Sequence, residues 1–211
     1  IKVKSILIFS KITIILYRSI YLLFIRGHPM ASGKRDHLID TALELFCQNG
    51  FHATGVDKII ETAGVARMTM YNHFKSKDEL ILATLRRRDE KFRNGFMRAV
   101  ERLGRTPKDR LLAIFDALEE WFREDNFSGC MFINASAEFS GTDDPIHMAS
   151  AEHKILMRQY FKKLTTEANT DAPDELADEL MLLAEGAIVM AYVAGDANAA
   201  ARAKATAGKL I

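Results

Sequence analysis

The chain contains few residues that would cross-link it or interrupt its helices. Only two of its 211 residues are cysteine and only four are proline. Cys47 and Cys130 lie far apart in apolar surroundings, which excludes a disulfide framework and a thiolate metal site and favours a reducing, cytoplasmic compartment. We expect both to be small buried side chains, with a redox-sensing Cys130 as the alternative. The scarcity of proline favours long helices.

The sequence also lacks the patterns of several common classes of protein. No segment alternates as a β-strand does, and no internal repeat is present. A nucleophile elbow, a phosphate-binding loop, a Rossmann fingerprint and a zinc-protease helix are all missing. An enzyme is therefore a minor alternative, and we expect no cofactor. Because 48% of the residues are hydrophobic, the chain can bury a sizeable core.

Residues 1–29 differ in composition from the rest of the chain. They are rich in isoleucine and contain five Lys or Arg but no acidic residue and no alanine. Lys11 and Arg18 interrupt the apolar run, which argues against a secretory signal and makes a membrane anchor costly. We favour a third interpretation, an upstream extension with the native start at Met30. Residues 30–211 contain all 28 acidic residues but only the other 24 Lys or Arg, a net charge of −4. Binding to nucleic acid would therefore require a local basic surface.

The most informative stretch is residues 54–77, TGVDKIIETAGVARMTMYNHFKSK. Its apolar positions have helical spacing, and Thr54 with Asp57 three residues later can cap a first helix. Gly64 can adopt the positive φ that a sharp turn requires. A second helix is predicted at about residues 67–74, with Met70 and Phe74 facing inward. Two short helices joined in this way are typical of the helix-turn-helix, whose second helix enters the DNA major groove.

The outer face of that second helix carries side chains that suit DNA. A guanidinium can bind guanine, an amide can bind adenine, a methyl-bearing side chain can contact thymine, and hydroxyls can bind phosphate. The outward residues are Arg67, Met68, Thr69, Tyr71, Asn72 and His73.

The string GVARMTMYNHFKSKDEL resembles the helix-turn-helix signature of the tetracycline-repressor-like (TetR/AcrR) transcriptional regulators. The resemblance is close over residues 35–82 and looser over the remainder. It implies phosphate contacts from Thr69, Tyr71, His73 and Lys77, and base contacts from Arg67, Met68 and Asn72. Thr54, at the start of the first helix, completes the expected set of DNA-binding residues.

The remaining segments are predicted to be helical as well, giving an all-α fold. Helices are expected at residues 35–49, 76–102, 108–126, 128–139, 146–168, 173–194 and 196–210. The clearest break lies at residues 104–107. We place the domain boundary there and expect a helix-turn-helix domain at 30–82, a connecting helix at 83–104 and a helical domain at 105–211. The resemblance implies that this last domain binds an effector and dimerises.

Two sites are expected in the second domain. The first is an apolar effector pocket with a polar rim, for which the candidates are Phe115, Trp121, Phe122, Met131, Asn134, Glu138 and His153. A transition-metal site that combines Glu138, His147 and His153 is a less favoured alternative. The second, which the resemblance implies, is a two-fold dimer interface through residues 155–164 and 180–193. Its candidates are Ile155, Leu164, Leu180, Leu183, Ala187 and Met190.

The sequence predicts an all-α, cytoplasmic DNA-binding regulator. The resemblance implies that it acts as a homodimer on a palindromic double-stranded DNA operator and responds to a small-molecule effector. Repression is the favoured output. A membrane-anchored helical interaction protein, which would depend on residues 1–29, is the main alternative.

Overall fold

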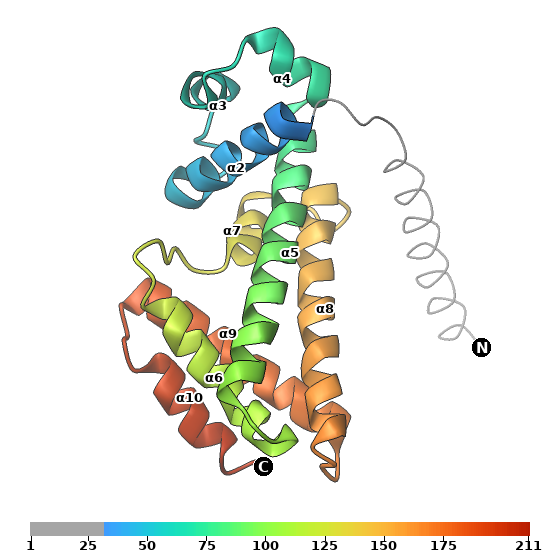
Figure 1. Cartoon of the computed structure of the whole chain (residues 1–211), viewed down its shortest axis with the longest axis vertical. Helices are drawn as coiled ribbons and strands as arrows, with labels where there is room; N and C mark the ends of the chain where they lie inside the picture. Colours follow the sequence, from blue (N-terminus) through green and yellow to red (C-terminus); the bar gives the residue numbers. More distant parts are fainter. Residues whose placement is uncertain (1–31) are drawn as a thin grey trace, which may run out of the picture. The chain divides into compact units, whose positions relative to one another are not determined.

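Helices account for all the regular structure in residues 32–211, the part of the chain that the computed structural model describes (Figure 1). The all-α prediction is therefore confirmed for these residues, whereas the extension predicted at residues 1–29 lies outside them. Along the chain the helices are α2 (Ser32–Asn49), α3 (Val56–Ala63), α4 (Arg67–His73), α5 (Lys77–Leu103), α6 (Pro107–Phe122), α7 (Met131–Glu138), α8 (Pro145–Glu167), α9 (Pro173–Ala194) and α10 (Ala199–Ala207).

The chain divides into two units after Asp36. Of the first unit, the structure describes only residues 32–36, which form the beginning of α2. The second unit, residues 37–211, contains the other helices and every site discussed below.

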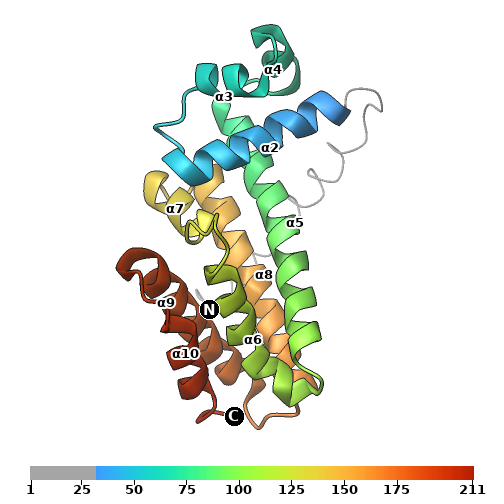
Figure 2. The same cartoon turned by 60° about the vertical axis from the view of Figure 1, so that its left-hand side comes forward.

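A small helical core lies at the N-terminal side of the second unit, where α2 crosses the start of α5 (Figure 2). Its fully buried side chains come from α2, α3, α4 and α5, and they include Leu38, Ile59, Met70 and Leu80. The His37 ring N–H donates to the carbonyl of Ala63 at 3.0 Å and so ties α2 to the end of α3.

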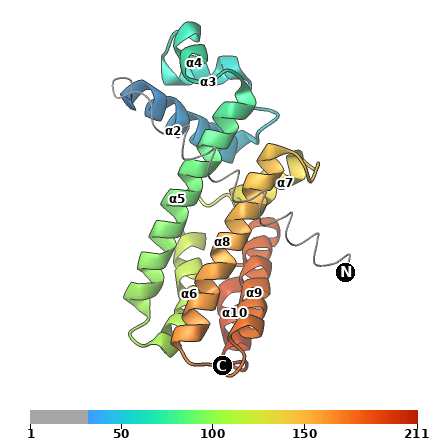
Figure 3. The same cartoon turned by 90° about the vertical axis from the view of Figure 1, so that its right-hand side faces the viewer.

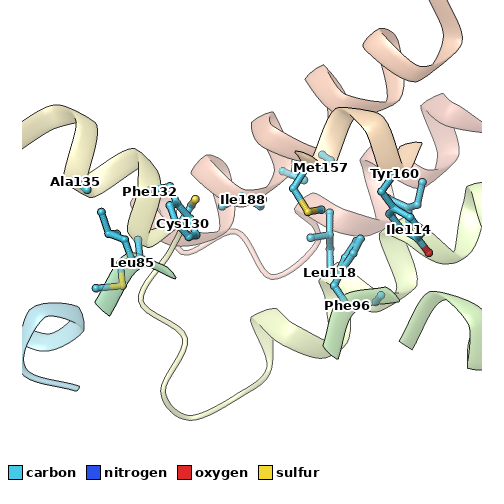
Figure 4. Close-up of a cluster of buried hydrophobic side chains, with 14 of the residues drawn as sticks. Leu85, Phe96, Ile114, Leu118, Cys130, Phe132, Ala135, Met157, Tyr160 and Ile188 are labelled. Atoms are coloured by element: carbon cyan, nitrogen blue, oxygen red, sulfur yellow. The ribbon is translucent and has the colours of Figure 1, made fainter. Parts of the chain in front are cut away.

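The second core is built around the remaining length of α5. That helix packs against α6 and α8, α8 packs against α9, and α10 covers α6 and α9 (Figure 3). Apolar side chains from these helices and from α7 interlock along the bundle, as Figure 4 shows for Leu85, Phe96, Leu118, Phe132 and Met157. Their burial removes apolar surface from water, which is the main favourable contribution to the stability of the fold.

Local sequence signals explain where four of the described helices, α5, α6, α8 and α9, begin. The Ser76 hydroxyl accepts the N–H of Glu79 at 3.1 Å and so caps the start of α5. A complete capping box between Thr106 and Asp109 starts α6. Proline occupies the first turn of α6, α8 and α9, where its missing N–H has no helical partner to lose.

Several boundary predictions were wrong. The helices predicted at 128–139 and 196–210 are shorter and form α7 and α10, which begin at Met131 and Ala199. The N-cap of α3 is Gly55 rather than Thr54, and no side chain caps that helix. The helix predicted at 108–126 ends at Phe122, and residues 123–130 form a connection to α7. Within residues 32–211, no helix has both the length and the apolar character needed to cross a bilayer.

Candidate nucleic-acid interface and effector cavity

The turn between α3 and α4 takes its shape from a glycine. Gly64 has φ 62°, in the left-handed region that residues with a Cβ rarely adopt. The Val65 N–H donates to the carbonyl of Ile60 at 3.2 Å, and the Gly64 N–H donates to Glu61, as in a Schellman motif. Nothing lies within 4 Å of a Cβ placed on Gly64, so the backbone conformation is the reason for glycine here.

Helix α4 separates a buried face from an exposed one. Met70 and Phe74 are buried, which confirms the predicted inward positions. Met68 is 70% exposed and Tyr71 is 44% exposed. Arg67 and Asn72 are also exposed, whereas Thr69 and His73 are half-buried at the edges of the exposed face. The resulting surface has donors, hydroxyls and apolar tips but no acidic residue of its own.

Two cationic side chains, Arg67 and Lys77, belong to the expected DNA-binding set, and each contacts a partner within the protein. Arg67 forms an ion pair with Asp57 of α3 through exposed side chains. Lys77, the first residue of α5, donates from Nζ to the His52 carbonyl at 3.3 Å. The exposed Arg67–Asp57 ion pair contributes little to stability, and the Lys77 contact is a single exposed hydrogen bond to a backbone carbonyl. Phosphates or bases can therefore compete for both cations.

Thr54 does not belong to this surface. Its side chain is only 2% exposed, and its hydroxyl lies 2.7 Å from the Gly50 carbonyl and 3.3 Å from the Leu45 carbonyl. The hydroxyl therefore holds the end of α2 against the following turn. We correct the expectation that this side chain contacts DNA.

An apolar cavity lies between α5, α6, α8 and α9 in the second core. Its walls include Phe92, Phe96, Trp121, Met157 and Ile188. Its interior volume is about 20 Å³, room for roughly one water molecule. A narrower groove adjoins it and shares Phe92, Trp121, Cys130 and His153 as lining residues.

The titratable groups that line this cavity are paired. The His153 ring N–H donates to Asp89 at 2.8 Å, and Asp89 also accepts from Arg93. Burial lowers the pKa of His153. Burial by itself would raise the pKa of Asp89, but the hydrogen bonds from His153 and Arg93 outweigh it and hold that pKa below its usual value.

Only three of the seven expected pocket residues line the cavity or the groove. Trp121 and His153 line the main cavity, and Met131 lines the groove. Phe115, Phe122, Asn134 and Glu138 line neither. Other residues that line the cavity or the groove were not predicted from the sequence, among them Arg88, Phe92, Phe96, Lys154 and Glu185. The spacing of four between Arg88, Phe92 and Phe96 puts these three on one helix face, which was a usable signal.

The residues of the alternative metal site are held apart. His147 donates to the Phe139 carbonyl at 2.8 Å, whereas His153 binds Asp89. Within residues 32–211, no group of three His, Cys, Asp or Glu could hold a metal ion. Both cysteines are free: Cys130 is buried, with its sulfur 3.4 Å from Lys154 Nζ, and Cys47 is half-buried.

Glu138 connects α7 to the helix-turn-helix region. Its two carboxylate oxygens accept the backbone N–H groups of Phe51 and His52 at 2.8 and 2.6 Å. The His52 ring also donates to the Glu138 carbonyl at 3.0 Å. Gly50 has φ 85°, and a Cβ on it would lie 3.0 Å from the carboxylate, so glycine suits both the turn and this approach. We refer to these contacts as the Glu138 clamp.

An apolar stripe on α9 has no cover in the protomer. Its residues follow the spacing i, i+4, i+7, i+8 and i+11, which places them on one side of the helix: Leu182, Gly186, Val189, Met190 and Val193. Val193 is 76% exposed and Met190 is 45% exposed. Met148 and Ile155 add a second exposed apolar pair on α8.

The other expected interface residues point into their own protomer. Leu164, Leu180 and Ala187 are buried against the core, and Leu183 is half-buried. Ion pairs from Arg158 to Asp178 and from Lys162 to Asp174 join α8 and α9 along the edge of this region.

A short exposed helix set by a tight turn and backed by a buried core makes this a helix-turn-helix DNA-binding protein. Residues 38–84 match the model of the bacterial regulatory proteins of the tetR family. Residues 107–207 match the model of the tetracyclin repressor-like C-terminal domain. The chain therefore belongs to the TetR family of transcriptional regulators, which are not enzymes. Regulators of this family bind DNA operators and small-molecule effectors and form homodimers.

Two curated relatives carry opposite descriptions. The HTH-type transcriptional activator FasR of Mycolicibacterium smegmatis is 36% identical over 44% of this chain and 42% of that protein. The HTH-type transcriptional repressor NemR of Escherichia coli is 27% identical over 54% of this chain and 58% of that protein. The chain thus spans about half the length of these relatives.

Among solved structures, a TetR-family transcriptional regulator from Streptomyces coelicolor is similar to this chain with a TM-score of 0.76. It is 27% identical, and the match covers 84% of this chain and 94% of that one.

Proposed function

We propose that this chain is a cytoplasmic, ligand-responsive repressor that binds a palindromic operator as a homodimer. The observation that carries the proposal is the exposed face of α4, which presents Arg67, Met68, Tyr71 and Asn72 without an acidic neighbour on the same helix. Such a set combines groups that bind phosphate with groups that distinguish base edges in the major groove. A protein that occupies a promoter in this way excludes polymerase without needing any further surface.

The apolar stripe on α9 supports the homodimer. Large exposed apolar surfaces on a soluble domain mark contact sites, and a two-fold axis lets one stripe pair with its own copy. The exposed Met148 and Ile155 of α8 extend the same kind of surface, so a four-helix contact would bury them as well. The axis would also relate two α4 helices, which is why we expect an inverted repeat in the operator.

Helix α7 offers a connection between the effector cavity and the DNA-binding region. Cys130 and Met131, at the start of α7, line the cavity and the groove. Glu138, at its end, holds the backbone of Phe51 and His52. A ligand that displaces the first turn of α7 would therefore disturb the Glu138 clamp. It shifts the population of DNA-binding dimers only if it prefers one of the two arrangements.

Replacing Arg67 with alanine is expected to weaken operator binding by about 1–3 kcal/mol and to relax the preference at one base pair. The guanidinium is exposed and held only by a surface ion pair with Asp57, so it can turn to a base edge. Fluorescence anisotropy with the operator and single-base variants of it measures both effects. Unchanged affinity and unchanged preference would remove Arg67 from the base-reading set.

Replacing Lys77 with alanine is expected to weaken binding to all duplexes by a similar factor and to reduce the salt slope by about one unit. Lys77 is the first residue of α5, and its Nζ donates to the His52 carbonyl at 3.3 Å. A phosphate bound at this helix N-terminus could take the place of that carbonyl. The same anisotropy titrations at several salt concentrations test this expectation. A selective loss at one base pair would show that Lys77 reads sequence instead. The contrast between the Arg67 and Lys77 variants tests the proposed function.

A further inference from the structure

We propose that the effector is a small aromatic carboxylate, with its ring in the apolar cavity and its carboxylate bound by the guanidinium of Arg88. The inference rests on the proposed function and assigns a chemical class to its ligand.

The walls of the cavity favour a flat apolar body. The Phe92 and Trp121 rings meet edge to face with centroids 4.7 Å apart, and Phe96 stacks beside Phe92 at 5.7 Å. On the groove side, the Phe132 ring lies parallel to the His153 ring at 3.7 Å. Aromatic walls bury large apolar areas and prefer stacked or edge-on partners, so an aromatic ring gains more here than a flexible chain does. Figure 4 shows Phe96, Leu118, Cys130, Met157 and Ile188, which also line the cavity.

The charged side chains that line the cavity are already paired within the protein, so none of them needs a ligand of opposite charge. Lys154 Nζ lies 2.6 Å from both carboxylate oxygens of Glu185. His153 is bound to Asp89, which is neutralised by Arg93. A ligand charge placed against these pairs would have to break one of them, and an unpaired buried charge is costly. The charge that selects a ligand must therefore come from elsewhere on the lining.

Arg88 supplies that charge. It lines the groove next to Trp121, Met131 and His153, and its guanidinium lies 5.5 Å from the centroid of the Phe92 ring. Its neighbours Arg87, Lys91 and Arg93 on α5 each pair with a carboxylate. Arg88 has no such partner among residues 32–211. A half-buried guanidinium stacked on an aromatic face presents its N–H fork to a carboxylate, which it can bind with two parallel hydrogen bonds.

The cavity must widen to admit a ring, and one wall is suited to move. Trp121 packs edge to face on Phe127 at 5.0 Å, and both are half-buried. Phe127 belongs to the connection at residues 123–130, which contains no helix. A ligand ring that takes the place of Phe127 against Trp121 keeps the indole covered by an aromatic surface. The free energy of the new contact then offsets that of the lost one.

Three probes of one shape test the inference. Benzoate, benzamide and benzamidinium differ in charge but hardly in size. Trp121 is the only tryptophan in the sequence, so its fluorescence reports binding at this wall. At constant ionic strength, we expect benzoate to give a saturable change in the Trp121 fluorescence of the full-length protein. Benzamide should bind at least about tenfold more weakly, and benzamidinium more weakly still.

Substitution of Arg88 provides the second half of the test. Arg88→Gln should lower benzoate affinity about tenfold and bring it close to that of benzamide. Arg98 is an exposed arginine on the same helix, so Arg98→Gln is the matched control. It should change neither the benzoate affinity nor the benzamide affinity. Equal binding of the three probes, no saturable benzoate signal, or an Arg88→Gln variant with unchanged benzoate selectivity would overturn the inference. The DNA-binding titrations separate this failure from a failure of the proposed function, since a protein that binds its operator but not benzoate refutes only the ligand class.

Discussion

Replacing Met190 with arginine is expected to convert the proposed dimer into monomers and to lower affinity for a palindromic operator at least about a hundredfold. Met190 belongs to the α9 stripe and is 45% exposed in the protomer, so the substitution can be accommodated in a folded monomer. At a two-fold interface it would place two unpaired charges against each other in an apolar contact. Without the partner, each half-site must be bound separately, and the linkage between them is lost.

The matched control is Leu210→Arg, which introduces the same charge at an apolar position that is 43% exposed near the C-terminus. Light scattering behind size exclusion and operator titrations should show a dimer with full affinity for this variant. A Met190→Arg protein that remained dimeric with unchanged operator affinity would place the interface on another surface.

Removing the Glu138 carboxylate is expected to have the second large effect. In Glu138→Ala, the N–H groups of Phe51 and His52 lose their charged acceptor. The Phe51 side chain is buried, so water replaces the lost contact poorly. We expect a loss of about 2 kcal/mol in the free energy of unfolding, or about 4–8 °C in Tm. The amides of Phe51 and His52 should also exchange faster with solvent.

Two further variants make the Glu138 measurement specific. Glu138→Gln keeps one acceptor oxygen and should lose only part of this stability. Glu124→Ala removes an exposed acid from the connection before α7 and should change neither Tm nor the two exchange rates. If Glu138→Ala behaves as Glu124→Ala does, the clamp contributes nothing to the link between α7 and the DNA-binding region.

The helix-turn-helix could be predicted because its signals are local. Gly64 takes a positive φ, Met70 and Phe74 are buried, and Ser76 caps α5, all as spacing and residue type indicate. Thr54 was misplaced for a related reason. Its hydroxyl could cap α3 or donate to a backbone carbonyl at the end of α2, and it lies beside the carbonyls of Leu45 and Gly50. Only the packing of α2 against the residues that follow it decides between these partners.

The contacts of the second domain could not be predicted because they join residues that are distant in the chain. The Glu138 clamp joins side chain and backbone across more than eighty positions. Helix α9 is apolar around most of its circumference, so periodicity could not tell its stripe for a partner from the side that packs on α8. Leu180 and Ala187 therefore point into the protomer core, whereas Met190 is exposed.

The DNA that the purified protein selects from a random pool tests most directly the claim that the exposed face of α4 reads an operator. After binding at low salt and sequencing of the retained duplexes, we predict an inverted repeat whose half-site centres lie about one helical turn, 10–10.5 base pairs, apart or a multiple of it. Retention of no enriched sequence by a folded dimer would contradict the account.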